Sequence, residues 1–407
     1  MSLRYEIAVV GAGVGGLAVA ALLRSLGHWV TVYDQAPAPV LDGPGVVLPP
    51  AAFGVLERLG IDGAARTLGV RIDGITGHDG GSGDTVLDLS YGSGGALALQ
   101  RSALVQLLYA EAEARGVDFH FGKRILSAAT TGHPYLRIEG GTQAGPFDYL
   151  IDAGGAHSPL SPLVARERRF GTVWATVPLP EGESDLGGLI RQRYEGAAQM
   201  AAVVPLGTAP GDSVPQAAVY WSLRGARVRN WAAAGIEAFK ADVSAFWPDL
   251  GDLIGPATEE DFFFAPVKQG GLTRPARRRT ARIGEAAHQG NPMFAPGGSL
   301  ALMDAMVLAD CMGEYELEGV STRYALRRWL HLRAYQGLSL ALTPMFQSRF
   351  GWQATLRNRV LSPATRVFSG TATRVLDGEV LPMGLWGKRK QTSVRPVGRR
   401  TIGEPGE

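Results

Sequence analysis

Short apolar runs near the N-terminus predict a strand, a helix and a second strand, in that order. Residues 7–10 (IAVV) are continuously apolar, which suits a strand buried on both faces of a parallel sheet. Residues 17–23 (LAVAALL) are strong helix formers, and residues 29–33 (WVTVY) predict the next strand. Strands and helices that alternate in this way are typical of an α/β protein.

A glycine-rich loop joins the first predicted strand to the helix and has the spacing of a dinucleotide-binding loop. Gly11 permits a tight turn, Gly13 lets the backbone approach a pyrophosphate, and Gly16 lets the helix pack on the strand. The phosphate charge would rest on free N–H groups at the helix N-terminus. The candidate cofactor-binding residues of this loop are Gly11, Ala12, Gly13, Val14, Gly15 and Gly16.

An acid ends the second predicted strand, at the place where a dinucleotide site binds ribose. Asp34 lies 23 residues after Gly11 and is followed by Gln35, and both are candidate cofactor contacts. A carboxylate here accepts hydrogen bonds from ribose hydroxyls and disfavours a 2′-phosphate. A glycine motif alone is weak evidence, and an ordinary strand–helix turn is the alternative. Strand, loop, helix, strand and acid nevertheless occur in the required order, so we predict a dinucleotide site, without distinguishing FAD from NAD.

The middle of the chain alternates between apolar and polar positions, a pattern that predicts a sheet. Strand candidates lie within residues 170–223, and a helix is expected over residues 231–246. Inward-facing residues of this sheet are candidates for a substrate pocket, although aromatic residues at this spacing are more often core. The candidates are Trp174, Gln199, Tyr220 and Phe264. Residues 306–350 predict long helices, in which Tyr335 is expected to be a packing residue.

Charge and cysteine content narrow the function classes. Forty Lys and Arg against 38 Asp and Glu give a net charge of +2, which is too balanced for a nucleic-acid-binding protein. The single cysteine, Cys311, excludes an internal disulfide framework and a multi-cysteine metal site, so we expect a reducing, cytoplasmic location. No apolar stretch is long enough to predict a membrane span, and no signal peptide is expected.

Further motifs carry a resemblance to a known family. Residues 99–108 read LQRSALVQLL, residues 152–161 read DAGGAHSPLS, and residues 282–288 read RIGEAAH. Residues 292–305 read PMFAPGGSLALMDA. Together with the GAGVGG loop, these segments make the chain similar, over nearly its whole length, to the single-component FAD-dependent aromatic hydroxylases, the 4-hydroxybenzoate and salicylate hydroxylase group.

The resemblance implies which residues contact FAD. It places Arg101 on the cofactor, although an arginine at a helix start can equally be a solvated end residue. It places Glu285 on the ribityl chain and Gly297 at the flavin ring, where backbone N–H groups would face the negative charge of reduced flavin. The further implied cofactor contacts are Pro292, Gly298 and Ser299, and the adjacent substrate-pocket candidates are Met293 and Phe294. Ser299 can also be read as a helix N-cap.

The motif at residues 152–161 departs from the family pattern at three positions. The family has Gly, Asp and Arg where this chain has Asp152, Gly154 and Ser161. In the family, that aspartate and arginine help to bind FAD and to manage the nicotinamide donor. We therefore hypothesise that NAD(P)H reduces the flavin slowly, or only when substrate is present; the alternative is that Gly154 has no effect. His288, which follows an apolar strand, is more often structural than catalytic.

The fold implied by the resemblance is α/β, with a Rossmann-like FAD-binding domain, an inserted mixed β-sheet substrate domain and a helical C-terminal region. The FAD-binding domain would be discontinuous, and the expected segments are 1–72, 97–168 and 268–310. The substrate domain would comprise residues 73–96 and 169–267. Helices would occupy residues 311–386, and a basic, flexible tail residues 387–407.

The activity implied by the resemblance is that of an FAD-dependent monooxygenase. NAD(P)H would reduce FAD, and a C4a-hydroperoxyflavin would transfer one oxygen atom from O2 to an aromatic or conjugated small molecule. No metal site, nucleic-acid partner or membrane span is expected. Two alternatives remain: a flavoprotein oxidase or dehydrogenase with altered NAD(P)H use, and a non-catalytic scaffold that keeps the fold.

Overall fold

The first apolar run is the central strand of a six-stranded sheet. The computed structural model describes residues 3–183, 185–224, 235–290, 296–346 and 351–361. In it, β1 (Glu6–Val10) pairs in parallel with β2 (Trp29–Tyr33) and with β12 (Tyr149–Asp152). The strand order is β18-β19-β12-β1-β2-β8, completed by β8 (Asp118–His120), β18 (Ala276–Arg277) and β19 (Thr280–Arg282). The two strands predicted at the N-terminus are confirmed.

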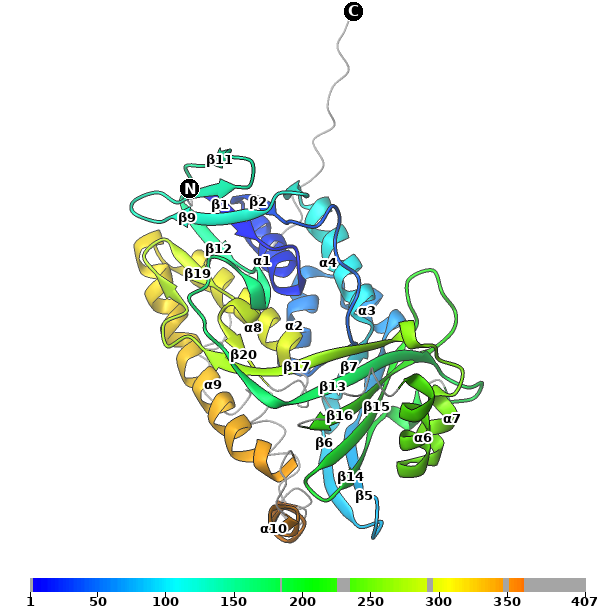
Figure 1. Cartoon of the computed structure of the whole chain (residues 1–407). Helices are drawn as coiled ribbons and strands as arrows, with labels where there is room; N and C mark the ends of the chain where they lie inside the picture. Colours follow the sequence, from blue (N-terminus) through cyan, green and yellow to red (C-terminus); the bar gives the residue numbers. More distant parts are fainter. Residues whose placement is uncertain (1–2, 184, 225–234, 291–295, 347–350, 362–407) are drawn as a thin grey trace, which may run out of the picture.

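Both faces of this sheet are covered, which explains why β1 is apolar throughout. Ile7 and Val9 belong to a core cluster with α1 (Val14–Ser25). Ala8 and Val10 belong to a second cluster, formed with a small sheet of β9 (Ile125–Ala129), β10 (Tyr135–Ile138) and β11 (Gln143–Ala144). Helix α1 packs between α4 (Arg101–Ala114) and α8 (Pro296–Glu314), as Figure 1 shows.

A small antiparallel sheet separates this layer from the second half of the molecule. It consists of β3 (Val46–Leu48), β7 (Ala96–Leu99) and β4 (Val70–Ile72), with β7 in the middle. The helices α2 (Pro50–Leu59) and α3 (Asp62–Leu68) connect β3 to β4. Val47 and Ala98 of this sheet pack against Leu206 and Ala218 of the larger sheet described next.

The alternating middle of the chain forms an eight-stranded, mostly antiparallel sheet. Its strands are β5 (Gly74–Asp79), β6 (Thr85–Ser90), β13 (Arg166–Pro178), β14 (Leu189–Glu195), β15 (Gln199–Gly207), β16 (Gln216–Arg224), β17 (Phe262–Gly271) and β20 (His288–Gln289). The order is β20-β17-β13-β16-β15-β14-β5-β6. The domain boundary expected between residues 267 and 268 therefore falls inside β17, and β20 extends the sheet beyond it.

Two helices cover the outer face of the eight-stranded sheet. They are α6 (Ile236–Phe246) and α7 (Pro248–Ile254), and Trp221 of β16 meets Phe239 and Phe246 of α6 edge to face. The helix expected over residues 231–246 is thus described from Ile236, and residues 231–234 lie outside the described residues. The mixed α/β architecture expected from the sequence is confirmed.

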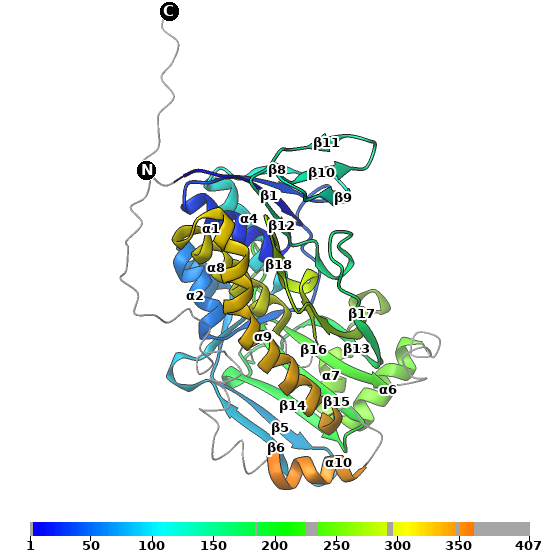
Figure 2. The ribbon, with the colours of Figure 1, turned by 90° about the vertical axis from the view of Figure 1, so that its left-hand side faces the viewer.

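One long helix bridges the two halves. Figure 2 shows α9 (Leu317–Phe346) running from the six-stranded sheet to the eight-stranded sheet. At one end, Tyr324 donates a hydrogen bond to the carbonyl of Arg282; at the other, Phe346 packs on Tyr194. α10 (Gly351–Leu356) and a π-helical turn (Arg357–Leu361) follow, and the expected helices and tail at 362–407 lie outside the described residues. No described helix combines the length and the apolar character needed to cross a bilayer.

Candidate active site

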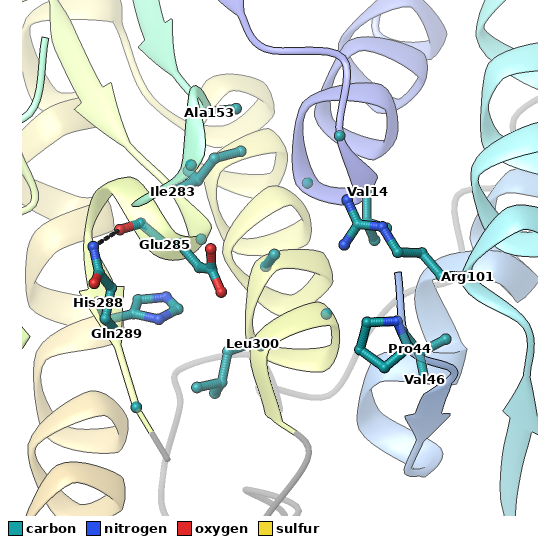
Figure 3. Close-up of a pocket in the computed structure, with 18 of the residues that line it drawn as sticks. Val14, Pro44, Val46, Arg101, Ala153, Ile283, Glu285, His288, Gln289 and Leu300 are labelled. Carbon is teal, nitrogen blue, oxygen red and sulfur yellow. Dashed lines mark hydrogen bonds between the residues drawn. The ribbon is translucent and has the colours of Figure 1, made fainter. Parts of the chain in front are cut away.

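A cavity of about 260 Å³ lies where α1, α8, α9 and the eight-stranded sheet meet. Figure 3 shows Arg101 across this cavity from Glu285, His288 and Gln289. The lining residues come from segments far apart in the sequence: Gly13, Val14, Gly15, Pro44, Gly45, Val46, Arg101, Ala153, Gly155, Tyr220, Gln269, Ile283, Gly284, Glu285, His288, Gln289, Gly290, Gly297, Gly298, Leu300, Ala301, Leu332, Tyr335 and Gln336.

The glycine loop is built so that its backbone faces this cavity. Gly11 has φ +105°, and a Cβ there would lie 2.3 Å from the carbonyl oxygen of Ala153. A Cβ on Gly16 would lie 1.9 Å from the carbonyl oxygen of Gly11, so a side chain fits at neither position. Around Gly13, by contrast, nothing lies within 4 Å of the Cβ position, and α1 begins there with no side-chain cap. The N–H groups of the first turn are therefore open to an anionic ligand.

Asp34 lies beside the loop, and its carboxylate holds the backbone. One oxygen accepts a hydrogen bond from the N–H of Ala12 at 2.6 Å, and the other accepts from Ala36 at 2.8 Å. Gln35 is exposed. A carboxylate oxygen can accept more than one hydrogen bond, so these backbone contacts leave Asp34 able to bind a ribose hydroxyl as well. That contact stays a prediction.

Arg101 is the first residue of α4, and its side chain lies in the cavity wall. It packs against Gly43, where a Cβ would come within 2.4 Å of the Arg101 Cδ. Its Nε is buried without a hydrogen-bond partner among the described residues. A buried, unpaired guanidinium nitrogen is costly unless a ligand accepts its hydrogen bond. The geometry thus favours a ligand contact over the solvated-end interpretation.

The segments of the third motif meet at the N-terminus of α8. Glu285 lines the cavity, and its Oε1 would lie 3.8 Å from a Cβ on Gly297. Gly297 and Gly298 are in the first turn of α8, facing the same cavity. The Ser299 hydroxyl donates to the carbonyl of Val47 at 2.7 Å, so it joins α8 to β3 rather than capping the helix. The predicted residues Pro292, Met293 and Phe294 lie outside the described residues.

A buried charged network supports His288, and sequence reasoning missed most of it. His288 Nε2 lies 2.7 Å from Asp304 Oδ2, and Arg328 Nε donates to Asp304 Oδ1 at 2.6 Å. The Gly284 N–H also donates to Asp304. Burial alone would raise the pKa of Asp304, but Arg328 and His288 outweigh it and lower the pKa to about 2. The Asp304 carboxylate thus holds His288 through Nε2, which favours a structural role for this histidine.

The second motif is rebuilt around Asp152. Asp152 Oδ1 accepts hydrogen bonds from the Ser158 hydroxyl at 2.6 Å and from the Gly154 N–H at 3.1 Å. A Cβ on Gly154 would lie 3.0 Å from Ser158 Cβ and 3.2 Å from Asp152 Oδ1. The Ser161 hydroxyl donates to the carbonyl of Ala286. The space for an aspartate at residue 154 is thus occupied by the side chains that hold this loop.

The four substrate-pocket candidates that were predicted in the sheet do not all face the cavity. Tyr220 lines the cavity. Trp174, its register partner, is on the same face of the sheet but stacks on Phe263 at 4.8 Å between ring centroids. Gln199 and Phe264 point to the outer face: Gln199 donates to the carbonyl of Ser222 at 2.7 Å, and Phe264 packs with the cluster under α6 and α7. Of these four candidates, only Tyr220 is among the described lining residues.

Residues that we did not predict complete the cavity wall. Gln269 comes from β17, and Leu332, Tyr335 and Gln336 come from α9. Tyr335, expected to be a packing residue, is therefore at the cavity. The spacing i, i+3, i+4 puts these α9 residues on one helix face, and this was the only sequence signal that could have found them.

Comparison with known proteins gives one consistent family. A family model described as an FAD binding domain matches residues 4–323. The chain is 27% identical to 3-amino-4-hydroxybenzoate 2-monooxygenase of Streptomyces cremeus over 75% of its length and 78% of that protein. It is 26% identical to 6-hydroxynicotinate 3-monooxygenase of Pseudomonas fluorescens, over 80% and 87%. Klebsiella pneumoniae HpxO, complexed with FAD and uric acid, shares the fold with TM-score 0.75, 19% identity and coverage of 91% and 97%.

Proposed function

The chain belongs to the FAD binding domain family, among the FAD-dependent aromatic hydroxylases, and we propose that it inserts one oxygen atom from O2 into an aromatic or conjugated small molecule. The observation that carries the proposal is the continuity of one cavity, which joins the open backbone at Gly13 to the wall formed by Tyr220 and Gln269. A cofactor held at the loop and a substrate held under the sheet would then meet.

The residues present fit FAD, a dianionic dinucleotide. The pyrophosphate would rest on the uncapped first turn of α1 at Gly13, with Arg101 supplying positive charge. Glu285 would take the ribityl hydroxyls, and Gly297 and Gly298 would border the flavin. When bound, FAD supplies the redox chemistry, accepting hydride from NAD(P)H and activating O2.

The chain itself has three tasks in this reaction. The N–H groups at the start of α8 stabilise negative charge beside Gly297 and Gly298. Leu300 and Leu332 exclude water from the cavity. Tyr220 and Gln269 position the substrate relative to the cofactor. No conventional acid–base pair is required for these tasks.

The test is spectroscopic and isotopic. We expect the purified protein to carry oxidised-flavin absorbance, to consume O2 with NADH or NADPH, and to incorporate one labelled oxygen atom from O2 into product. Reduction by substrate with no label would favour an oxidase or dehydrogenase, the alternative motivated by Gly154 and Ser161. A protein that takes up no FAD would be a scaffold. We also propose a cytoplasmic location, on the single buried thiol of Cys311.

A further inference from the structure

Among the described residues that β17 and α9 contribute to the cavity wall, three of four are polar and none carries a positive charge. Among the described lining residues, Arg101 is the only Lys or Arg, and it lies across the cavity from His288 and Gln289 (Figure 3). Gln269 and Gln336 present amides, and Tyr335 presents a phenol.

The orientation of the Gln269 amide is fixed by a neighbouring arginine. Arg168 of β13 donates to Gln269 Oε1 from Nε at 3.0 Å and from Nη2 at 2.7 Å. A guanidinium only donates hydrogen bonds, so the oxygen of the amide must face Arg168 and the NH2 group must face away from it. The Gln269 Nε2 is buried and has no hydrogen-bond partner within the described part of the chain.

Gln269 therefore lies between Arg168 and the cavity. Arg168 is not among the described lining residues, and its two hydrogen bonds to Gln269 go to a neutral amide instead of a carboxylate. The neighbouring Lys268 does not bring a positive charge to the cavity either. Successive residues of a strand point to opposite faces, and Gln269 is the one that faces the cavity. A ligand in the cavity would meet the amide NH2 of Gln269 and not the guanidinium of Arg168.

Tyr335 adds a second unpaired polar group to this wall. Its hydroxyl is buried without a hydrogen-bond partner among the residues that the structure describes, and burial raises the pKa of the phenol, so the proton stays on the oxygen. Tyr335 and the Gln269 amide are both hydrogen-bond donors that await an acceptor. A neutral acceptor satisfies them, whereas a carboxylate there would be desolvated with the amide, and not the guanidinium of Arg168, in contact with it, which costs more.

We propose that Gln269 makes the cavity selective for neutral aromatic substrates, which carry a carboxamide, carbonyl or hydroxyl oxygen toward Gln269, over the corresponding ring carboxylates. The inference rests on the proposed monooxygenase function and names the substrate class of that same site. It sets the chain apart from the two relatives named for hydroxybenzoate and hydroxynicotinate substrates, which are carboxylates at neutral pH.

Matched probes that differ only in this group test the selectivity. The FAD-loaded protein is titrated with 4-hydroxybenzamide against 4-hydroxybenzoate, and with 6-hydroxynicotinamide against 6-hydroxynicotinate, and binding is followed by perturbation of the flavin absorbance. We expect each amide to bind at least about tenfold more tightly than its acid. Equal or tighter binding of the acids, or no binding of either probe, would overturn the proposal.

A substitution that uncovers Arg168 should reduce or abolish the preference for the amide. Gln269→Ala removes the amide, so the amide-to-acid ratio of dissociation constants should move about tenfold toward the acid. Adding Arg168→Ala to that variant should abolish the gain. Equal weakening of both probes by Gln269→Ala, or a gain that survives loss of Arg168, would contradict a role in charge selection.

The chain offers a matched control pair. Arg137 and Gln143 are exposed register partners in the small β9–β11 sheet, and their alanine variants should leave the ratio unchanged. Flavin content and NAD(P)H-dependent reduction are measured on every variant. Their absence from the native protein would refute the proposed function, whereas a flavin-loaded protein that prefers carboxylates would refute the selectivity alone.

Discussion

The loop glycines differ in what a side chain would meet at each position. At Gly11 and Gly16, backbone atoms lie 2.3 Å and 1.9 Å from the Cβ position, so substitution there disturbs the fold itself. At Gly13 the Cβ position is open, and its φ of −80° is one that any residue adopts. Gly13 is therefore the position at which ligand binding can be separated from folding.

We expect Gly13→Val to abolish flavin retention without unfolding the protein. The valine side chain would occupy the space through which the pyrophosphate approaches α1. Flavin absorbance relative to protein absorbance, and Tm of the flavin-free protein, measure the two effects. Gly63→Val is the control, because Gly63 is exposed on α3 with nothing within 4 Å. A Gly13→Val protein that purifies with normal flavin content would place the dinucleotide elsewhere.

Arg101→Ala should weaken FAD binding by about 1.5–3 kcal/mol, the typical loss for a charged hydrogen bond. The side chain is part of the cavity wall, and no described residue accepts a hydrogen bond from its Nε. Fluorescence titration of the flavin-free protein with FAD measures the dissociation constant, with exposed Arg137→Ala as control. An unchanged dissociation constant for FAD would instead support the interpretation of Arg101 as a solvated residue at a helix end.

At the scale of elements, Asp304 connects three segments that meet at the cavity. Its carboxylate on α8 holds His288 of β20, the Gly284 N–H and Arg328 of α9. Asp304 and Arg328 are both fully buried. Removing one partner of such a pair leaves the other charge without compensation.

Asp304→Asn should lower the free energy of unfolding by about 3 kcal/mol at neutral pH. The pKa of Asp304 is lowered from 3.8 to about 2, so its stabilisation is present above pH 3.8 and is lost as pH falls through about 2. The variant should lack that part of the acid sensitivity. Thermal unfolding at pH 7 and between pH 4 and 2 measures both effects, with exposed Asp242→Asn as control. If the variant lost stability with acid as the native protein does, Asp304 would not be a source of the acid sensitivity.

The sequence predicted the elements better than the faces that they present. The apolar run at 7–10 and the strand at 29–33 were found because local patterning decides them. Period-two alternation does not tell which face of a sheet meets a cavity. It therefore predicts Gln199 and Phe264 as pocket residues together with Tyr220, although these two point to the outer face of the sheet. The partnership of Asp304 with Arg328 depends on the packing of α9 on α8, which no local pattern encodes.

At the scale of the whole molecule, the cavity exists because distant segments converge. The glycine loop, the start of α4, residues 283–290, the start of α8 and one face of α9 each contribute a part. Motifs located the first four, because each is a short segment of recognisable spacing. One face of α9 lines the cavity, and Figure 2 shows this helix crossing from one sheet to the other.

At residues 152–161 the chain differs from the family pattern, and we expect this difference to affect reduction of the bound flavin by NAD(P)H. Gly154 and Ser161 replace the aspartate and arginine of the family pattern, and the loop is held instead by Asp152, Ser158 and the Ser161 contact with Ala286. We expect NADH and NADPH to reduce the bound flavin slowly when no aromatic ligand is present. Stopped-flow reduction of the FAD-loaded protein, with and without ligand, measures this rate.

Restoring the family residues should accelerate that reduction, provided that room is made for them. Gly154→Asp alone would bring its Cβ to 3.2 Å from Asp152 Oδ1, and two carboxylates in one buried site repel each other. Because Asp152 occupies that space, the variant to test combines Asp152→Gly, Gly154→Asp and Ser161→Arg. Faster ligand-free reduction by the triple variant than by the native protein would support the argument. Rapid, saturable reduction of the native protein without ligand would contradict it, and Gly154 would then be a neutral turn residue.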